Sequence, residues 1–203
     1  MVAVRSEGPY ATAPAPDEQR MLLPNVAWKE YVLLRDVLDG PGIRMTYVQG
    51  VLELMSPSRE HEMWKKNLAR LVELYAYRDG IDLRGYGSTT FRREAKDRGA
   101  EPDECYVVGK PLGDVPDFVI EVIHSSPLLD KLGVYAALAI PEVWIFRDGR
   151  LSVHRLDASS SAYAVQPRSA FLPGLDLALV ERFVLREDTN AALRELEAAL
   201  AKT

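Results

Sequence analysis

The sequence predicts an α/β (α+β) fold in which a central mixed β-sheet is flanked by helices. Segments 59–77 and 125–139 repeat apolar residues at the spacing of amphipathic helices. Short β-branched and aromatic runs lie between and after these two segments, as strands do. One run, 118–123, is apolar at nearly every position, which is typical of a strand buried on both faces of a sheet.

Composition sets the class of protein. The chain has 203 residues, of which 47% are apolar and 27% charged, so we expect one domain with a real core. No window approaches 18 consecutive apolar residues, and no apolar stretch follows Arg5, so we expect neither a membrane span nor a signal peptide. The single cysteine, Cys105, cannot form an internal disulfide. These features favour a cytoplasmic protein.

The first 25 residues show no periodicity and contain Gly8, Pro14, Pro16 and Pro24, so we expect a flexible N-terminal arm over residues 1–25. A single domain then spans residues 26–203, with its core at about 56–156. Its remaining elements follow from local patterns. They are a helix at 26–38, strands at 44–49, 51–55, 83–92, 104–108, 118–123, 142–146 and 151–156, a short strand or turn at 176–185, and a helix at 189–201.

Acidic residues carry the most information about function. Glu121 is the one charged residue in the apolar run 118–123, and alternation of side chains places Asp117 and Glu121 on one face of that strand. A buried carboxylate costs free energy unless a cation or hydrogen-bond donors meet it. Glu121 is therefore either half of a buried ion pair with an arginine or part of a functional site.

Asp103 opens the preceding strand, directly after Pro102. Asp is an ordinary residue at such a turn, but Glu121 follows Asp103 by eighteen positions, which is enough for two adjacent strands to pair. If they pair, the two carboxylates converge as the hard oxygen ligands that Mg²⁺ prefers. Spacing alone leaves both interpretations open.

Lys131 lies within the helix expected after the acidic strand, next to Asp130. A lysine at such a position normally faces solvent. If the helix folds back over the carboxylates, the ammonium group can orient a water or stabilise charge that develops on a phosphate.

The order of helix, strand, strand beginning Pro-Asp, strand bearing an acid, helix and strand resembles the core of the PD-(D/E)XK nucleases, the restriction-endonuclease-like fold. More specifically, the chain is similar to the Uma family of restriction endonuclease-like proteins, from about residue 28 to residue 156. The segments that carry the resemblance are TYVQGVLELMSPSREHE at 46–62, GSTTFRRE at 87–94, EPDECYVV at 101–108, PDFVIEVIHSSP at 116–127 and DKLGVYAALAIPEVWIFRDGRL at 130–151.

This resemblance implies a DNA endonuclease that depends on Mg²⁺ (or Mn²⁺). By position, Asp103 matches the family's first metal carboxylate, and Glu121 matches the acid of the (D/E)XK motif. The lysine position of that motif holds Ile123 here. Many family members likewise carry a lysine on the following helix instead, where this chain has Lys131.

Two further residues match the family by position. His61 matches a histidine near the start of the first core helix, and Asp117 matches a second Pro-Asp acid at the start of the acidic strand. The family often has Glu in the strand before the Gly50 turn, where this chain has Thr46. The resemblance therefore implies catalytic roles for Asp103, Glu121, Lys131, Asp117 and His61.

The net charge of −5 is uneven along the chain. Residues 59–98 contain ten Lys and Arg against seven Asp and Glu, or +3, which leaves −8 for the rest. A solvated helix face explains such a pattern. A DNA-facing surface at Lys65, Lys66, Arg92 and Arg93 explains it as well.

Cleavage of both strands of a duplex favours a homodimer, since one site reaches one phosphate. Trp28, Tyr31 and Tyr47 are candidate anchors of that dimer or ordinary core residues. The alternative function is a catalytically inactive nuclease-fold module for protein interaction or nucleic-acid binding. The absent strand lysine and acidic net charge favour the module, whereas the retained acids favour the enzyme.

Overall fold

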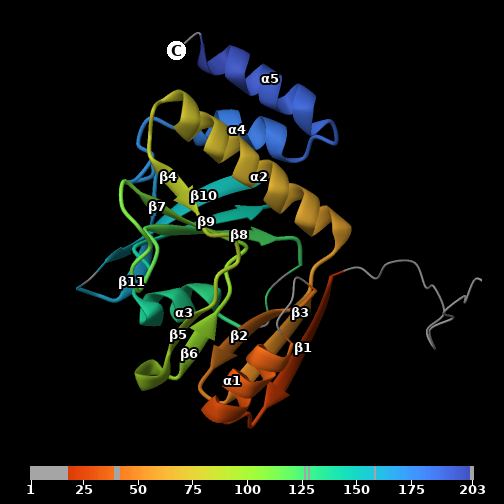
Figure 1. The fold of residues 1–203 in the computed structure, drawn as a ribbon, viewed down its shortest axis with the longest axis vertical. Helices are drawn as coiled ribbons and strands as arrows, with labels where there is room; N and C mark the ends of the chain where they lie inside the picture. The colour runs from red at the N-terminus through yellow and green to blue at the C-terminus, as the bar shows by residue number, and fades with distance from the viewer. Residues whose placement is uncertain (1–17, 39–41, 126, 128, 158, 202–203) are drawn as a thin grey trace, which may run out of the picture.

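The computed structural model describes residues 18–38, 42–125, 127, 129–157 and 159–201, which form two β-sheets and five α-helices (Figure 1). The first sheet is antiparallel throughout. Its strands, in spatial order, are β1 (Gln19–Pro24), β3 (Val51–Ser56), β2 (Arg44–Val48), β6 (Arg98–Ala100) and β5 (Phe91–Arg93).

The second sheet is mixed, because β8 and β9 pair in parallel while all its other pairs of adjacent strands are antiparallel. Its strands, in spatial order, are β11 (Ala162–Gln166), β10 (Arg150–Asp157), β9 (Glu142–Arg147), β8 (Phe118–Ile123), β7 (Glu104–Val108) and β4 (Leu83–Gly85). The predicted α/β (α+β) class with a mixed sheet is confirmed.

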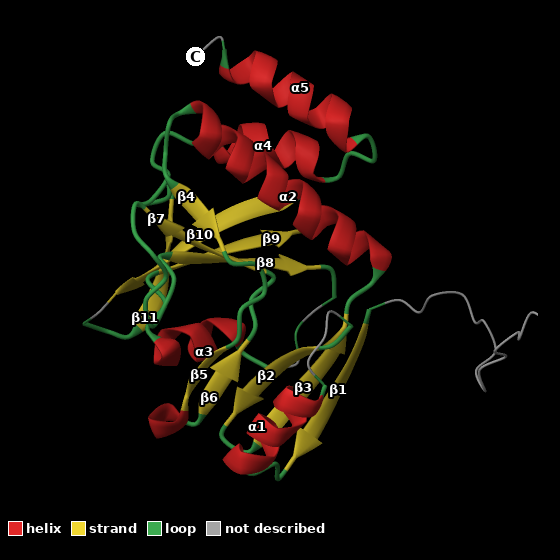
Figure 2. Cartoon of the chain, viewed as in Figure 1, coloured by secondary structure: helices red, strands yellow, loops and turns green. Residues whose placement is uncertain are grey.

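Helices and sheets alternate in layers (Figure 2). One face of the second sheet is covered by α2 (Arg59–Arg78) and α4 (Leu177–Val184), and α5 (Thr189–Leu200) packs on these two helices. The helix α3 (Lys131–Leu138) lies between the two sheets and contacts strands of both. The helix α1 (Trp28–Val37) packs on the first sheet through Tyr31.

Three apolar clusters follow these layers. The largest lies between α2, α4, α5 and the second sheet, and it contains the stacked rings of Phe118 and Trp144. A second surrounds α3, and Cys105 belongs to it, as expected of a small core residue. In the third, Tyr31 and Tyr47 stack 4.7 Å apart and are buried. These two tyrosines are therefore core residues of α1 and the first sheet, and not dimer anchors.

Two tight turns follow from residues that tolerate a positive φ. Gln49 and Gly50 join β2 to β3, and Asp148 and Gly149 join β9 to β10, all with positive φ. Such a pair of residues closes a two-residue hairpin. Gly99 in β6 has another reason to be glycine, since a Cβ there would overlap the Tyr31 hydroxyl.

The end of the segment predicted to be a flexible arm is a β-strand. Residues 19–24 form β1, which pairs with β3 along its whole length from Gln19↔Ser56 to Pro24↔Val51. Cross-strand hydrogen bonds supplied by β3 order this segment, although it lacks a clear period of its own. The remainder of the predicted arm, residues 1–17, lies outside the described residues.

The predicted strand 83–92 is wrong. Its two ends form separate strands, with β4 paired to β7 in the second sheet and β5 paired to β6 in the first. The chain crosses between the sheets here, and a short 3₁₀ helix, Glu94–Lys96, follows. Helix α3 begins at Lys131, later than the predicted start at residue 125.

The segment 176–185 is a helix, not a strand or turn. Asp176 caps α4 by accepting hydrogen bonds from the backbone N–H groups of Ala178 and Leu179. Val180, Phe183 and Val184 are its buried residues, at spacings of three and four. Both features are helix signals that the sequence contains. None of the helices in the described part of the chain has the length and hydropathy needed to cross a membrane.

Candidate active site

Asp103 and Glu121 lie opposite one another on neighbouring strands of the second sheet. The antiparallel register pairs Glu104 with Ile120, so one further step sets Asp103 against Glu121 on the same face. Their side chains are almost fully buried, with residue exposures of 2% and 5%. The backbone N–H of Val122 donates to Asp103 Oδ2 at 2.8 Å and ties the carboxylate to β8. The predicted pairing of these two strands is confirmed.

Helix α3 supplies two partners to Glu121. Lys131 Nζ donates to Oε1 and Oε2 at 3.3 Å each, and one turn later the Tyr135 hydroxyl donates to Oε1. Lys131 therefore faces the carboxylates and not solvent, because α3 packs between the sheets. Tyr135 is fully buried, and no local pattern distinguishes it from an ordinary core tyrosine.

Helix α2 holds His61 against Asp103. Ser58 caps this helix and accepts a hydrogen bond from the His61 backbone N–H at 3.1 Å, which fixes the first turn. The imidazole is fully buried, and its Nε2 lies 2.9 Å from Asp103 Oδ1. Both oxygens of Asp103 are thus bonded, one to α2 and the other to β8.

Two residues from the first sheet complete this cluster, and sequence reasoning missed both. Glu18 Oε2 lies 2.9 Å from His61 Nδ1, an ion-pair distance, although the angles are not those of a hydrogen bond. Arg20 pairs with Glu18 at 2.8 Å and with Glu53 at 2.6 Å. Glu18 and Arg20 belong to the segment that was predicted to be a flexible arm, and no local pattern marks them.

Burial and pairing move the pKa values of these groups in different directions. Burial raises the pKa of Glu121, and the neighbouring carboxylate of Asp103 adds to the rise while Lys131 opposes it. Burial would also raise the pKa of Asp103, but the hydrogen bond and charge of His61, the Val122 N–H and the charge of Lys131 together outweigh burial and lower it. Burial opposes charging of His61, but the carboxylates of Asp103 and Glu18 raise its pKa to about 9. The cluster therefore combines an ionised Asp103 with a Glu121 that resists ionisation.

Asp117 lies outside this cluster. Its Oδ2 accepts from the Val108 backbone N–H at 2.9 Å, and its Oδ1 pairs with Lys110 at 2.8 Å. Four residues of extended strand, about 13 Å, separate it from Glu121. The structure therefore brings together four of the five predicted residues: Asp103, Glu121, Lys131 and His61.

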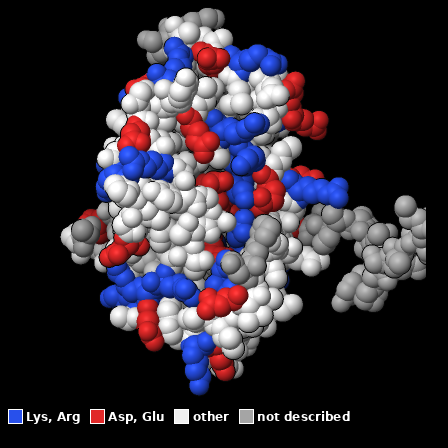
Figure 3. Space-filling view, in the orientation of Figure 1, with Lys and Arg blue, Asp and Glu red and all other residues white. Residues whose placement is uncertain are grey.

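The four predicted basic residues divide into two pairs. Lys65 and Lys66 lie on α2, close enough to Glu104 that their charges oppose the rise that burial causes in its pKa. Arg92 pairs with Asp36 of α1, and Arg93 donates to the Ala137 carbonyl of α3. Figure 3 shows Lys and Arg side chains gathered down the middle of one face, with Asp and Glu side chains interspersed.

Comparison with known proteins decides the family. The family model of Uma2, described as "Putative restriction endonuclease", matches residues 28–186. This chain belongs to the Uma2 family. The predicted resemblance is thereby confirmed. No curated protein matches the sequence.

A solved structure shares the fold of this Uma2 chain. It is the crystal structure of a putative nuclease belonging to DUF820 from Anabaena variabilis, with a TM-score of 0.51 and 15% sequence identity. The match covers 81% of this chain and 97% of that one. At this identity the likeness concerns the fold alone.

The donor set of this Uma2 chain can be compared with what Mg²⁺ needs. No three His, Cys, Asp or Glu side chains within the described residues are grouped to hold a metal ion. One or two carboxylates, completed by water and phosphate oxygens, are nonetheless the usual protein contribution to a Mg²⁺ site. Each oxygen of Asp103 keeps a second lone pair beside the bond that it accepts. Asp103 and Glu121 together therefore fit Mg²⁺ or Mn²⁺.

Proposed function

We propose that this Uma2 protein is an endonuclease that hydrolyses DNA phosphodiester bonds with the help of Mg²⁺ or Mn²⁺. The observation that carries the proposal is the pair of buried carboxylates, Asp103 and Glu121, facing each other across two strands with Lys131 at 3.3 Å from Glu121. Family membership supports a nuclease, and the donor chemistry of the pair supports the ion.

Asp103 and Glu121 would hold the ion, which would polarise the scissile phosphate and lower the pKa of a water molecule. The protein's own residues prepare the site. His61 and the Val122 N–H fix the two oxygens of Asp103, and Tyr135 fixes Glu121. Lys131 adds a positive charge beside the carboxylates, where it can orient the attacking water or offset charge that develops on the phosphate.

The alternative is an inactive nuclease-fold module that binds proteins or nucleic acid. One observation favours it, because the oxygens of Asp103 and Glu121 already have protein partners and need no ion to be stable. The two functions make different predictions about cleavage. The module would bind without cutting, and it would not need Asp103.

Cleavage of plasmid DNA by the purified protein tests the proposal. We expect nicked and linear products with Mg²⁺ or Mn²⁺, none with EDTA, and none from Asp103→Ala or Glu121→Ala. Asp82→Asn is the matched control, because Asp82 is an exposed carboxylate that pairs only locally with Arg84. Equal cleavage by wild type and Asp103→Ala, or no cleavage by wild type with either ion, would contradict the proposal.

We also propose that the active form is a homodimer. A single site reaches one phosphate, and a two-fold dimer is the commonest way to bring a second site to the other strand. Light scattering at tens of micromolar should report twice the mass of the chain. A monomer throughout that range would remove the dimer and leave the chemistry of each site unaffected.

A further inference from the structure

Glu18 and Arg20 lie at the start of β1, which is an edge strand of the first sheet. Both residues precede the part of the chain that the family model matches. That match begins at residue 28, whereas β1 spans Gln19–Pro24. Glu18 nevertheless contacts His61, a residue of the candidate active site, at 2.9 Å. Family membership therefore assigns no role to these two residues.

The Glu18 side chain is only 1% exposed, and each of its oxygens faces the cluster. Oε2 lies 2.9 Å from His61 Nδ1. Oε1 accepts hydrogen bonds from Arg20 Nε at 3.0 Å and from the Ser125 hydroxyl, which follows β8. Glu18 thus touches residues from α2, β1 and the end of β8 at once.

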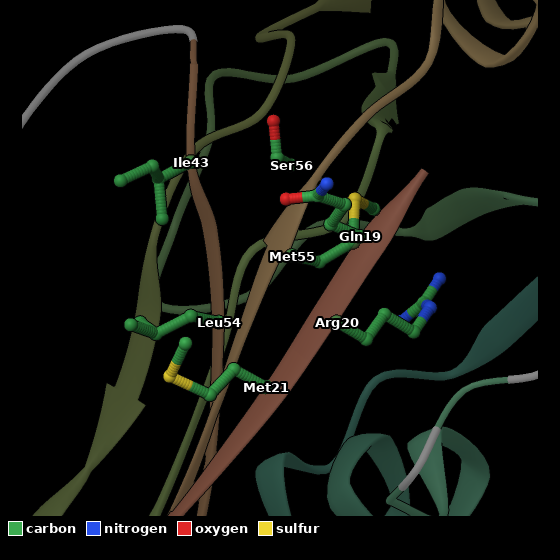
Figure 4. Close-up of a pocket in the computed structure, with 7 residues that line it drawn as sticks. All are labelled: Gln19, Arg20, Met21, Ile43, Leu54, Met55 and Ser56. Atoms are coloured by element: carbon green, nitrogen blue, oxygen red, sulfur yellow. The ribbon is translucent and has the colours of Figure 1, made fainter. Parts of the chain in front are cut away.

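Arg20 anchors Glu18 in this position. Its guanidinium binds Glu18 on one side and Glu53 of β3 on the other, and it also donates to Ser125 Oγ at 3.1 Å. Figure 4 shows that Arg20 extends from the face of β1 opposite to Met21, whose side chain lies with Leu54 and Ile43 along the neighbouring groove. Arg20 therefore serves the buried cluster, whereas Met21 belongs to the sheet's other face.

These contacts form a continuous chain of charges from the first sheet to the second. It runs from Glu53 through Arg20, Glu18 and His61 to Asp103. An imidazole ring that is held at both nitrogens cannot rotate about its Cβ–Cγ bond without losing a partner. A carboxylate behind a histidine commonly fixes the orientation of that ring in this way.

We propose that Glu18 is a positioning residue of the active site, which holds the His61 ring so that Nε2 faces Asp103 and keeps that carboxylate aligned. The inference rests on the proposed function, because it treats Asp103 as the ligand being aligned. Its general chemical basis is that a buried carboxylate is costly to desolvate and is a poor choice for merely attaching an edge strand. The site thereby extends beyond the residues that define the family.

Two measurements on the full chain test this role, with Glu18→Ala and Glu18→Gln as variants. Calorimetric titration with Mn²⁺ should show a Kd raised about 10- to 100-fold in Glu18→Ala, the usual cost of losing a residue that supports a ligand. Glu18→Gln keeps the shape of the side chain and should lose less. Long-range ¹H–¹⁵N spectra of the metal-free protein should show shifted His61 ring signals in both variants.

Glu181→Ala is the matched control. Glu181 pairs with Arg150 and accepts from the Leu151 N–H, so its removal also breaks an ion pair and a hydrogen bond, but from α4 on the other face of the second sheet. It should leave the Mn²⁺ Kd and the His61 signals unchanged. A loss of stability alone would appear in both Glu181→Ala and Glu18→Ala. A positioning role changes the Mn²⁺ Kd and the His61 ring signals in Glu18→Ala only.

The outcomes separate the two proposals. Wild type and Glu18→Ala binding Mn²⁺ within twofold of each other would overturn the positioning role and leave the proposed function intact. Absence of Mn²⁺ binding by wild type would overturn the proposed function and, with it, alignment of a metal ligand. If Glu18→Ala does not fold, the spectrum of Glu18→Gln decides, and His61 signals identical to wild type would overturn the inference.

Discussion

Lys131 Nζ lies at the same distance, 3.3 Å, from both carboxylate oxygens of Glu121. The lysine comes from the first turn of α3 and not from β8, where the second position after Glu121 holds Ile123. Since α3 packs between the two sheets, its first residue reaches the carboxylate from the layer next to the strand. Helix α3 thus supplies, through Lys131, the positive charge that β8 lacks at position 123.

Removal of that charge should destabilise the fold as well as abolish cleavage. Lys131→Met leaves Glu121 buried without its cation, which typically costs about 3–5 kcal/mol. The loss should be larger at alkaline than at acidic pH, because burial raises the pKa of Glu121 and lets the carboxyl become neutral as the pH falls. Urea denaturation measures the effect. The double variant Lys131→Met/Glu121→Gln should recover most of the stability, and failure to recover it would assign the loss to packing.

Divalent ions should stabilise the native state. An ion present at 100 times its Kd adds about 2.7 kcal/mol, or a rise in melting temperature of about 5–10 °C for a chain of this size. We expect this rise with Mg²⁺ and Mn²⁺ in wild type and Asp82→Asn, and its absence in Asp103→Ala. Thermal scans with and without EDTA provide the measurement, and an equal rise in Asp103→Ala would show that the ions bind elsewhere.

Stability of the metal-free protein should depend on pH at both ends of the range. The pKa of His61 in the folded protein, about 9, lies above its ordinary value of 6.5. The stability that protonated His61 contributes to the fold is therefore complete below pH 6.5 and is lost as the pH rises toward 9. Burial opposes ionisation of Glu18, but His61, Ser125 and Arg20 lower its pKa to about 2, so its contribution is present above pH 4.5 and is lost as pH falls toward 2. Urea denaturation in EDTA should therefore show stability falling below about pH 4.5 and again above about pH 6.5, and the raised pKa of Glu121 should add a further fall as the pH rises above 4.5.

The control for this pH profile is His61→Gln, which should remove the loss of stability that His61 causes as the pH rises toward 9. It should also reduce the loss at acid pH, because the contact with His61 is the largest of the effects that lower the pKa of Glu18. His154 offers a comparison, since burial lowers its pKa and it has no carboxylate among the causes of the shift. If the loss of stability at alkaline pH persists in His61→Gln, another titratable group causes it.

DNA binding should depend more on Lys65 and Lys66 than on Arg92 and Arg93. The two lysines act on Glu104, beside Asp103, whereas the arginines are engaged with α1 and α3. Lys65→Glu/Lys66→Glu should weaken binding at low salt and reduce the slope of log K against log salt by about 0.9 for each lost phosphate contact.

Fluorescence anisotropy with a labelled duplex measures this slope. Lys29→Glu, on the exposed surface of α1, makes the same kind of charge reversal at one site and should leave the slope unchanged. A larger loss from Arg92→Glu/Arg93→Glu than from the lysine pair would place the DNA on the other side of the molecule.

Local patterns in the sequence predict the elements that carry Asp103 and Glu121. The strands at 104–108 and 118–123 and the helix beginning at residue 59 all lie where apolar periodicity places them, because their faces are buried in the two main clusters. Glu121 stands out as the one charge in its strand. Its burial alone suggests a cationic partner, and that partner is Lys131 and not the expected arginine.

Contacts between distant segments are what local patterns do not predict. Glu18 meets His61 because β1 adds to the edge of β3, and nothing around Glu18 reveals that partner. The strands β4 and β5 are too short to show a period, and they separate because each pairs with a different sheet. Tyr135 has the pattern of a core residue, and only the position of α3 beneath β8 gives its hydroxyl a carboxylate to bind.

The position of β1 at a sheet edge has a consequence for how the protein would lose activity on heating. An edge strand is bonded on one side only, so it opens at a lower free energy than the strands inside a sheet. Opening of β1 would carry Glu18 and Arg20 away from His61 while the second sheet stays folded. DNA cleavage would then stop several degrees below the melting temperature of the whole domain. This loss of activity would be reversible, because the rest of the domain would still be folded.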